Sequence, residues 1–237
     1  MRKGKRIICL FLMCFLMSGL FPRAVIETQA AVKFNVSANQ MKKAINGYTV
    51  RVAVDNKEQR FIVKASEITK FTVKSKKYSS DKKKMTVKTI VYIDRKVATV
   101  KTTATLKYNL KGRKWKISSV TLGKGSISSV KLKGTWSGTY VAGQGQTTAK
   151  IVISEVSKDG YATGTFYFSA TPTNPRVPSG SYTVMGGYDK KTGKVTFVGD
   201  EWINQPSGYS MVDFYAYLDL RNKKIKSNNY SLVLSKK

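Results

Sequence analysis

The sequence predicts a mainly β protein, with an N-terminal α+β domain (one helix on an antiparallel sheet) and a C-terminal antiparallel β-barrel or sandwich of about eight strands. Three observations predict it. Apolar and polar residues alternate over most of the chain, which is the period of a half-buried strand. Turn residues separate these runs at short intervals. Only one segment, near residue 40, has a helical pattern, so one helix covers a sheet and the remaining strands pack among themselves.

Residues 1–30 predict a signal peptide. Four basic residues within the first six precede an apolar run of 15 residues, Ile7 to Phe21, shorter than the roughly 20 that a membrane-spanning helix needs. Thr28-Gln29-Ala30 offers small residues for cleavage, and retention as an N-terminal anchor is the alternative. Both cysteines, Cys9 and Cys14, lie in this segment. We therefore expect a secreted, cysteine-free mature chain, typical of a Gram-positive bacterium.

The chain contains no histidine, and the expected mature chain no cysteine. A Ser-His-Asp triad, a Cys-His pair, a His-ligated haem and a zinc site of the nitrogen and sulfur type are thereby excluded. Only carboxylate, Lys, Tyr or Ser chemistry remains. Asp200 or Glu201 with Asp213 would be the carboxylate pair of a glycosidase, a remote alternative. We expect no enzyme, no cofactor and no metal.

The segment VSANQMKKAING, from Val36 to Gly47, predicts the helix. Ser37 and Gln40 have the spacing of a capping box, and Gly47 suits a left-handed stop. The buried stripe is expected to contain Met41, Ala44 and Ile45. After it, alternating runs up to residue 120 predict antiparallel strands.

The closing hairpin of this segment, LKYNLKGRKWKISSV from Leu106 to Val120, resembles the last hairpin of cystatin-like and NTF2-like domains of secreted Gram-positive proteins. The resemblance implies a sheet that cups a pocket against the helix, which is an active site in some members and empty in many. This sequence supplies no polar catalytic residues for such a pocket. We assign residues 31–122 to this basic α+β domain. The Gly/Ser/Lys-rich residues 123–133 are expected to be a linker.

Positive charge is concentrated in the first domain. Residues 31–133 hold 26 Lys and Arg against 5 Asp and Glu, whereas residues 134–237 hold 12 against 7. This density predicts attraction to polyanions, namely an anionic cell-wall polymer, an acidic glycan or a membrane surface. The candidate contacts are Lys76, Lys77, Lys82, Lys83 and Lys84. Nucleic acid is not favoured, because only Tyr78 accompanies these lysines; solvation of strand faces and edges is the alternative role.

Regularly spaced strands and turns predict a barrel over residues 134–237. Gly134-Thr135-Trp136, Ala162 to Phe166 and the Gly186 to Asp189 turn are similar to avidin-like and lipocalin-like barrels. The resemblance implies that Trp136 plugs one end of the barrel; it does not imply biotin. The tyrosines and threonines on the polar strand faces suit a sugar, or alternatively only solvate the strands.

The loop WINQPSGY, Trp202 to Tyr209, is expected at one rim of the barrel. One hypothesis makes it a ligand site, with the binders Trp202, Asn204, Gln205, Tyr209 and Asp213. The other is structural: Trp202 and Ile203 fold inward, Asn204 and Gln205 bond the loop's own backbone, and Pro206 to Gly208 form the turn.

Together these patterns predict a secreted, extracellular, non-catalytic binding protein, retained at the cell surface by charge. Its basic domain would contact anionic polymer and its barrel would offer a ligand site at the rim. The alternative is a protein-interaction module, an inhibitor or host-facing adhesion factor, whose loops Thr171 to Gly180 and Trp202 to Tyr209 contact a protein partner.

Overall fold

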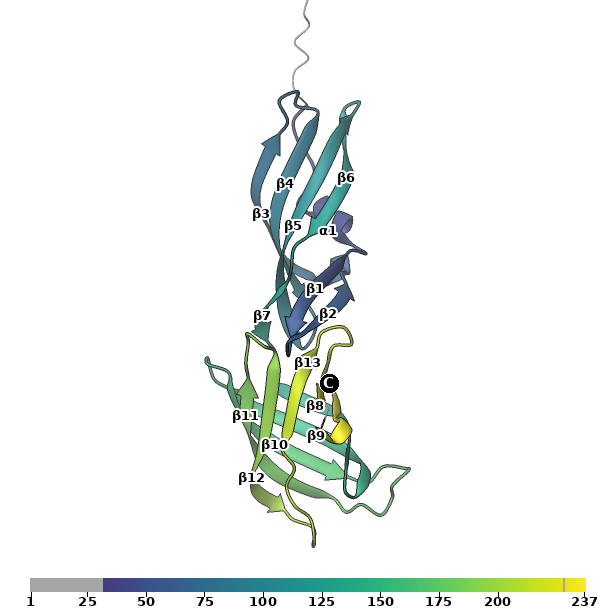
Figure 1. Ribbon diagram of the computed structural model, residues 1–237, viewed down its shortest axis with the longest axis vertical. Coiled ribbons are helices and arrows are strands. Elements are labelled where there is room, and N and C mark those ends of the chain that lie inside the picture. Colours follow the sequence, from purple (N-terminus) through teal and green to yellow (C-terminus); the bar gives the residue numbers. More distant parts are fainter. Residues whose placement is uncertain (1–31, 228) are drawn as a thin grey trace, which may run out of the picture. The chain divides into compact units, whose positions relative to one another are not determined.

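The computed structural model describes residues 32–227 and 229–237 (Figure 1). The expected signal peptide and both cysteines lie outside the described residues. The described chain is mainly β, as predicted, with one short α-helix, a curled N-terminal sheet and a closed eight-stranded antiparallel barrel. None of the helices in the described ranges has the length and apolar character required to cross a membrane.

Helix α1 (Ala38–Ile45) begins as the sequence predicts. The Gln40 backbone N–H donates to Ser37 Oγ at 3.2 Å, and the Ser37 N–H donates to Gln40 Oε1 at 2.8 Å, which completes the capping box. Gly47 follows at φ +86°, in the left-handed region. Met41 and Ile45 are buried, and they form the face of the helix that packs on the sheet.

A hairpin of β1 (Thr49–Val54) and β2 (Lys57–Ile62) follows the helix. Asp55 and Asn56 form its two-residue turn, both with positive φ, which is the backbone of the turn that matches strand twist. The register places Arg51 directly opposite Arg60. Val50, Val52 and Val54 face the core, so the polar partners of this alternation face outward.

The larger sheet has the strand order β3-β4-β5-β6, with β7 also paired to β5. A short 3-10 turn, η1 (Ala65–Glu67), precedes it. The strands are β3 (Ile68–Tyr78), β4 (Lys84–Asp94), β5 (Ala98–Lys111), β6 (Lys114–Leu122) and β7 (Ser126–Val130). Strand β5 is long enough to pair with β6 along its second half and with β7 along its first. The segment expected to be a linker therefore carries a strand of this sheet.

The barrel closes in the order β10-β11-β12-β13-β14-β15-β8-β9. The strands are β8 (Gly134–Ala142), β9 (Gly145–Val156), β10 (Tyr161–Ser169), β11 (Gly180–Tyr188), β12 (Lys194–Asn204), β13 (Phe214–Asp219), β14 (Lys224–Ser227) and β15 (Val233–Lys236), with the short turn η2 (Asn229–Ser231) before the last. The seam between β8 and β15 needs glycine, because a Cβ on Gly138 would lie 1.8 Å from the carbonyl oxygen of Val233.

Aromatic rings fill the barrel. Trp136 is fully buried and its Nε1 donates to the carbonyl oxygen of Leu132 at 2.6 Å, which agrees with a structural plug. Phe166 contacts the rings of Tyr140, Tyr182 and Phe214 at centroid distances between 5.0 and 5.6 Å. These contacts occupy the interior with side chains.

Side chains of the N-terminal part (residues 32–133) bond the backbone of the barrel. Gln59 on β2 donates through Nε2 to the carbonyl oxygen of Leu218 and accepts through Oε1 from the N–H of Leu220, both at 2.8 Å. The side-chain amide thus pairs with β13 as a neighbouring strand would. The sheet and the barrel are parts of one compact unit, Lys33–Lys237.

Candidate functional site

The β3–β4 and β5–β6 hairpins end side by side (Figure 1), and the N–H of Leu110 donates to the carbonyl oxygen of Lys83 at 2.8 Å. The five predicted contact lysines are exposed at the end of β3, in the following turn and at the start of β4: Lys76, Lys77, Lys82, Lys83 and Lys84. The neighbouring hairpin adds the exposed residues Lys111, Arg113 and Lys114, which are not among the predicted contacts. The runs of lysine were visible in the sequence, but their convergence depends on the β4–β5 register.

The outward face of this sheet alternates lysine with small polar residues. Along one cross-strand row the pairs are Lys77 with Thr86, Thr86 with Lys107, and Lys107 with Ser119. The next rows are Lys84 with Asn109 and Lys116, then Lys111 with Lys114. We call the exposed lysines of these rows, with Lys82 and Lys83 of the turn between β3 and β4, the lysine face: Lys77, Lys82, Lys83, Lys84, Lys107, Lys111, Lys114 and Lys116. No carboxylate occupies any of the row positions, so the rows have one sign of charge.

Asp81 fixes the turn between β3 and β4. Its carboxylate accepts from the hydroxyl of Ser79 at 2.5 Å and from the N–H of Lys83 at 3.0 Å. These hydrogen bonds, chiefly that from Ser79, hold the pKa of Asp81 below its ordinary value. The one carboxylate of this turn is therefore engaged in holding the lysines in place.

Aromatic side chains lie on the opposite face of the same end of the sheet. Phe34 contacts Tyr108 and Trp115 edge to face, at centroid distances of 5.1 and 5.5 Å. The N–H of Phe34 donates to the hydroxyl of Tyr78 at 3.0 Å. The Nζ of Lys76 lies 5.4 Å from the centre of the Phe34 ring. These rings pack against each other on the face of the hairpin end that is opposite to the lysine face.

The rim loop follows the structural hypothesis only in part. Trp202 is half-buried, with its ring 5.2 Å from that of Tyr182, and Tyr209 stacks on Phe168 at 5.6 Å. Ile203, expected to fold inward, is 60% exposed. Strand β12 continues to Asn204, and side chains alternate along a strand, so an inward Trp202 forces Ile203 outward.

The polar residues of the loop are already hydrogen-bonded. Gln205 Nε2 donates to the carbonyl oxygen of Tyr209 at 3.1 Å, within the loop as expected. Asn204 instead donates to the carbonyl oxygen of Ser179, which belongs to a different loop, at 3.2 Å. Asp213 accepts from the N–H of Gly199 at 3.0 Å. Of the five residues predicted as binders, Trp202 and Tyr209 come together around Phe168, while the three polar residues hold the chain around them.

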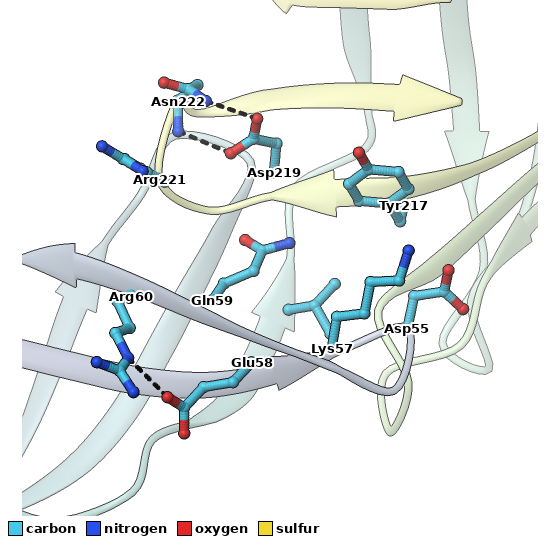
Figure 2. Close-up of a pocket in the computed structure, with 10 residues that line it drawn as sticks. Asp55, Lys57, Glu58, Gln59, Arg60, Tyr217, Asp219, Arg221 and Asn222 are labelled. Carbon is cyan, nitrogen blue, oxygen red and sulfur yellow. Dashed lines mark hydrogen bonds and ion pairs between the residues drawn. The ribbon is translucent and has the colours of Figure 1, made fainter. Parts of the chain in front are cut away.

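A cavity of about 420 Å³ lies where the β1–β2 hairpin faces the turn after β13 (Figure 2). Its lining combines carboxylates and cations: Asp55, Glu58 and Asp219 with Lys57, Arg60 and Arg221. Asp219 accepts from the N–H and Nδ2 of Asn222 at 2.9 and 2.8 Å, and from Lys226 at 2.9 Å. Burial alone would raise the pKa of Asp219, but these partners hold it below its ordinary value.

A buried ion cluster lies beside this cavity. Glu67 Oε2 accepts from Arg95 Nη1 at 2.6 Å, and its Oε1 accepts from Lys223 Nζ at 2.7 Å. Although burial would raise the pKa of Glu67, hydrogen bonding and charge from Lys223 and Arg95 lower it below 4.5. This cluster was not predicted from the sequence, because Arg95 and Lys223 are 28 and 156 residues away from Glu67 in the chain.

Among the described residues, no three His, Cys, Asp or Glu side chains group closely enough to hold a metal ion. Comparison with protein-family models, with curated proteins and with solved structures found no match. The geometry described above is therefore the basis for inferring function.

Proposed function

We propose that the protein is a secreted, non-catalytic binding protein of the cell envelope, whose lysine face contacts an anionic polymer. The observation that carries this proposal is the meeting of two lysine-rich hairpin ends, whose cross-strand rows contain no carboxylate. Neighbouring strands lie about 4.8 Å apart, and alternate residues along a strand about 6.7 Å apart. Lysines at such spacings repel one another, and an anionic chain laid across them would relieve that repulsion.

The hydroxyl and amide groups between the lysines support the same interpretation. Thr86, Ser119 and Asn109 lie directly beside lysines in the register. They offer hydrogen-bond donors to anionic oxygens between the ammonium groups. We also propose that this part is related to cystatin-like or NTF2-like domains. The barrel would be related to avidin-like or lipocalin-like domains.

The test measures binding of the mature full chain to an immobilised poly(glycerol phosphate) as a function of salt concentration. Affinity should fall steeply as salt rises, because binding releases counterions. K82Q/K83Q/K84Q should weaken binding and flatten the salt dependence, whereas K190Q/K191Q, in the exposed turn between β11 and β12, should change neither. Salt-independent binding, or equal losses in both triple and double variants, would contradict the proposal.

The exposed Ile203 favours a second candidate, a protein-interaction module that uses the rim loop. An isoleucine that is 60% exposed at the end of β12, beside the half-buried Trp202, is available to a protein surface. Its test is capture of a stoichiometric protein partner by the wild-type chain from the native secretion medium, with loss of capture in I203S.

A further inference from the structure

The arginines are distributed unevenly. From Lys33 onward the chain has six arginines among 38 cationic residues, the rest being lysine. Four of the six line one cavity of about 800 Å³, next to the cavity of Figure 2: Arg51, Arg60, Arg95 and Arg221. Lys64 and Lys223 complete its charged lining, and no carboxylate belongs to that lining. We call this cavity the arginine pocket.

Two arginines of the pocket face each other directly. The register of the β1–β2 hairpin pairs Arg51 with Arg60, so their Cβ atoms lie about 5 Å apart on one face. Like charges in this position destabilise a sheet. Glu58 offsets only one of them: it pairs with Arg60 at 2.7 Å, in an exposed ion pair of little strength. Among the described residues, no carboxylate lies within 4 Å of the Arg51 or Arg221 guanidinium.

The backbone of the barrel turn is held against this hairpin. Arg95 is buried and lies over the ring of Phe61, 4.4 Å from its centre. Its Nε and Nη2 donate to the carbonyl oxygens of Leu220 and Arg221, both at 2.9 Å. Arg95 is thus occupied in fixing the turn that carries Arg221. The exposed guanidiniums of Arg51 and Arg221 line the cavity, as do the Nη groups of Arg60, whose Nε pairs with Glu58. All three lie on segments held in place before any ligand arrives.

We infer that the arginine pocket binds a phosphate group. A guanidinium presents its donors as a planar fork that matches the oxygens of a phosphate or carboxylate, whereas a lysine acts as a point charge. A carboxylate has two oxygens and is satisfied by one fork. A phosphate has enough acceptor oxygens for several forks, and three exposed guanidiniums from β1, β2 and the β13–β14 turn supply them. The cavity also exceeds one phosphate in size, so Phe61, Ile62 and Thr49 would contact the rest of the ligand.

This site is separate from the lysine face and does not depend on it. The phosphate could belong to a small phosphorylated molecule, to a phosphodiester polymer or to a lipid headgroup. The shared chemistry is the phosphate, and the three sources are separated by three probes. These are inorganic pyrophosphate, soluble poly(glycerol phosphate), and phosphatidylglycerol vesicles with phosphatidylcholine vesicles as the neutral reference.

The experiment measures the affinity of the mature full chain for each probe by calorimetry or co-sedimentation, at fixed salt. R51Q/R60Q should weaken binding of at least one phosphate probe about tenfold or more, because the facing forks are removed. R51K/R60K keeps the charge but not the forks, and should lose most of that affinity too. The lysine-face variant K82Q/K83Q/K84Q should keep pyrophosphate binding, and the charge-matched control K190Q/K191Q should keep all binding.

Thermal unfolding first checks that each variant is folded. Each binding result then supports or overturns the inference. Wild-type affinity of R51Q/R60Q for every probe would overturn the phosphate site, as would absence of binding by the wild-type chain to all three probes. Wild-type affinity of R51K/R60K would overturn the role of the forks. Loss of polymer binding in K82Q/K83Q/K84Q alone, with R51Q/R60Q unaffected, would leave the lysine face standing and remove the arginine pocket.

Discussion

The Nε of Arg95, on the loop between β4 and β5, donates to the carbonyl oxygen of Leu220, 125 residues later, at 2.9 Å. The same guanidinium bonds Glu67 and the carbonyl oxygen of Arg221. One buried side chain therefore joins the N-terminal sheet, the η1 turn and the barrel. Its position explains why contacts separated so widely in sequence form one unit.

Replacing Arg95 with glutamine should destabilise the protein strongly. Glu67 would lose one buried partner, and two barrel carbonyls would lose their donors, a change that typically costs about 3–5 kcal/mol. Urea unfolding of the full chain measures this difference. R176Q changes an exposed arginine and should stay within about 0.5 kcal/mol of wild type. Equal stability of the two variants would contradict the role of Arg95.

Stability should fall with acid through Glu67. Its pKa in the folded protein is below the ordinary value of 4.5, so the folded state favours the charged form. Its contribution is therefore complete above about pH 4.5 and is lost as the pH falls through the folded-state pKa. Thermal midpoints between pH 6 and pH 3 measure the loss. E67Q should be less stable at pH 6 and should show a weaker pH dependence; a steeper one would contradict this assignment.

Closure of the barrel should depend on Gly138. In G138A the new methyl would collide with the backbone of Val233, and the β8–β15 seam would have to shift. The cost should be about 3 kcal/mol or more, at the upper end for overpacked sites. Gly143 has nothing within 4 Å of an added Cβ, so G143A is the matched control. Urea unfolding of both variants should show a loss in G138A only.

Substitutions of the adjacent residues Trp202 and Ile203 should have different effects on stability. W202A removes a ring that packs against Tyr182 and Phe168, and should destabilise the barrel by about 2 kcal/mol. I203S changes an exposed side chain and should stay within about 0.5 kcal/mol. Chemical unfolding of the two variants tests this alternation. A larger loss in I203S would mean that Ile203, not Trp202, faces the interior.

Local patterns predicted the local structure well. The capping box of Ser37 and Gln40 depends on neighbouring residues and is confirmed. The alternation of single strands is also local, and the predicted barrel or sandwich of about eight strands is a closed barrel of eight. The Gly/Ser-rich composition of residues 123–133 predicted a linker, yet β7 forms there because the long β5 has free backbone groups beside it. The prediction that Ile203 faces inward was wrong, because the strand was expected to end before it. Strand β12 continues to Asn204, and alternation along it places Ile203 on the face opposite to Trp202.

The candidate sites, too, were predicted where the pattern is local and missed where it depends on pairing between distant segments. The lysines of the β3–β4 hairpin were visible as runs, whereas Lys111, Arg113 and Lys114 join them only through strand register. The arginine pocket was not predicted from the sequence. The pairing of Arg51 with Arg60 is local, across the two-residue Asp55-Asn56 turn, but the approach of Arg221 comes from long-range contacts, which composition and periodicity do not encode.

Gln59 and Arg95 bond the main chain of Leu218, Leu220 and Arg221, and not their side chains. A peptide group is the same whatever residue carries it, so this attachment tolerates sequence drift at the barrel positions it contacts. The two positions that recognise the backbone, by contrast, have little freedom to vary. A substitution at Gln59 or Arg95 should therefore loosen the junction, whereas one at Arg221 should keep this attachment and change only the arginine pocket. The barrel turn is in this respect free to change its surface chemistry without loosening its attachment to the sheet.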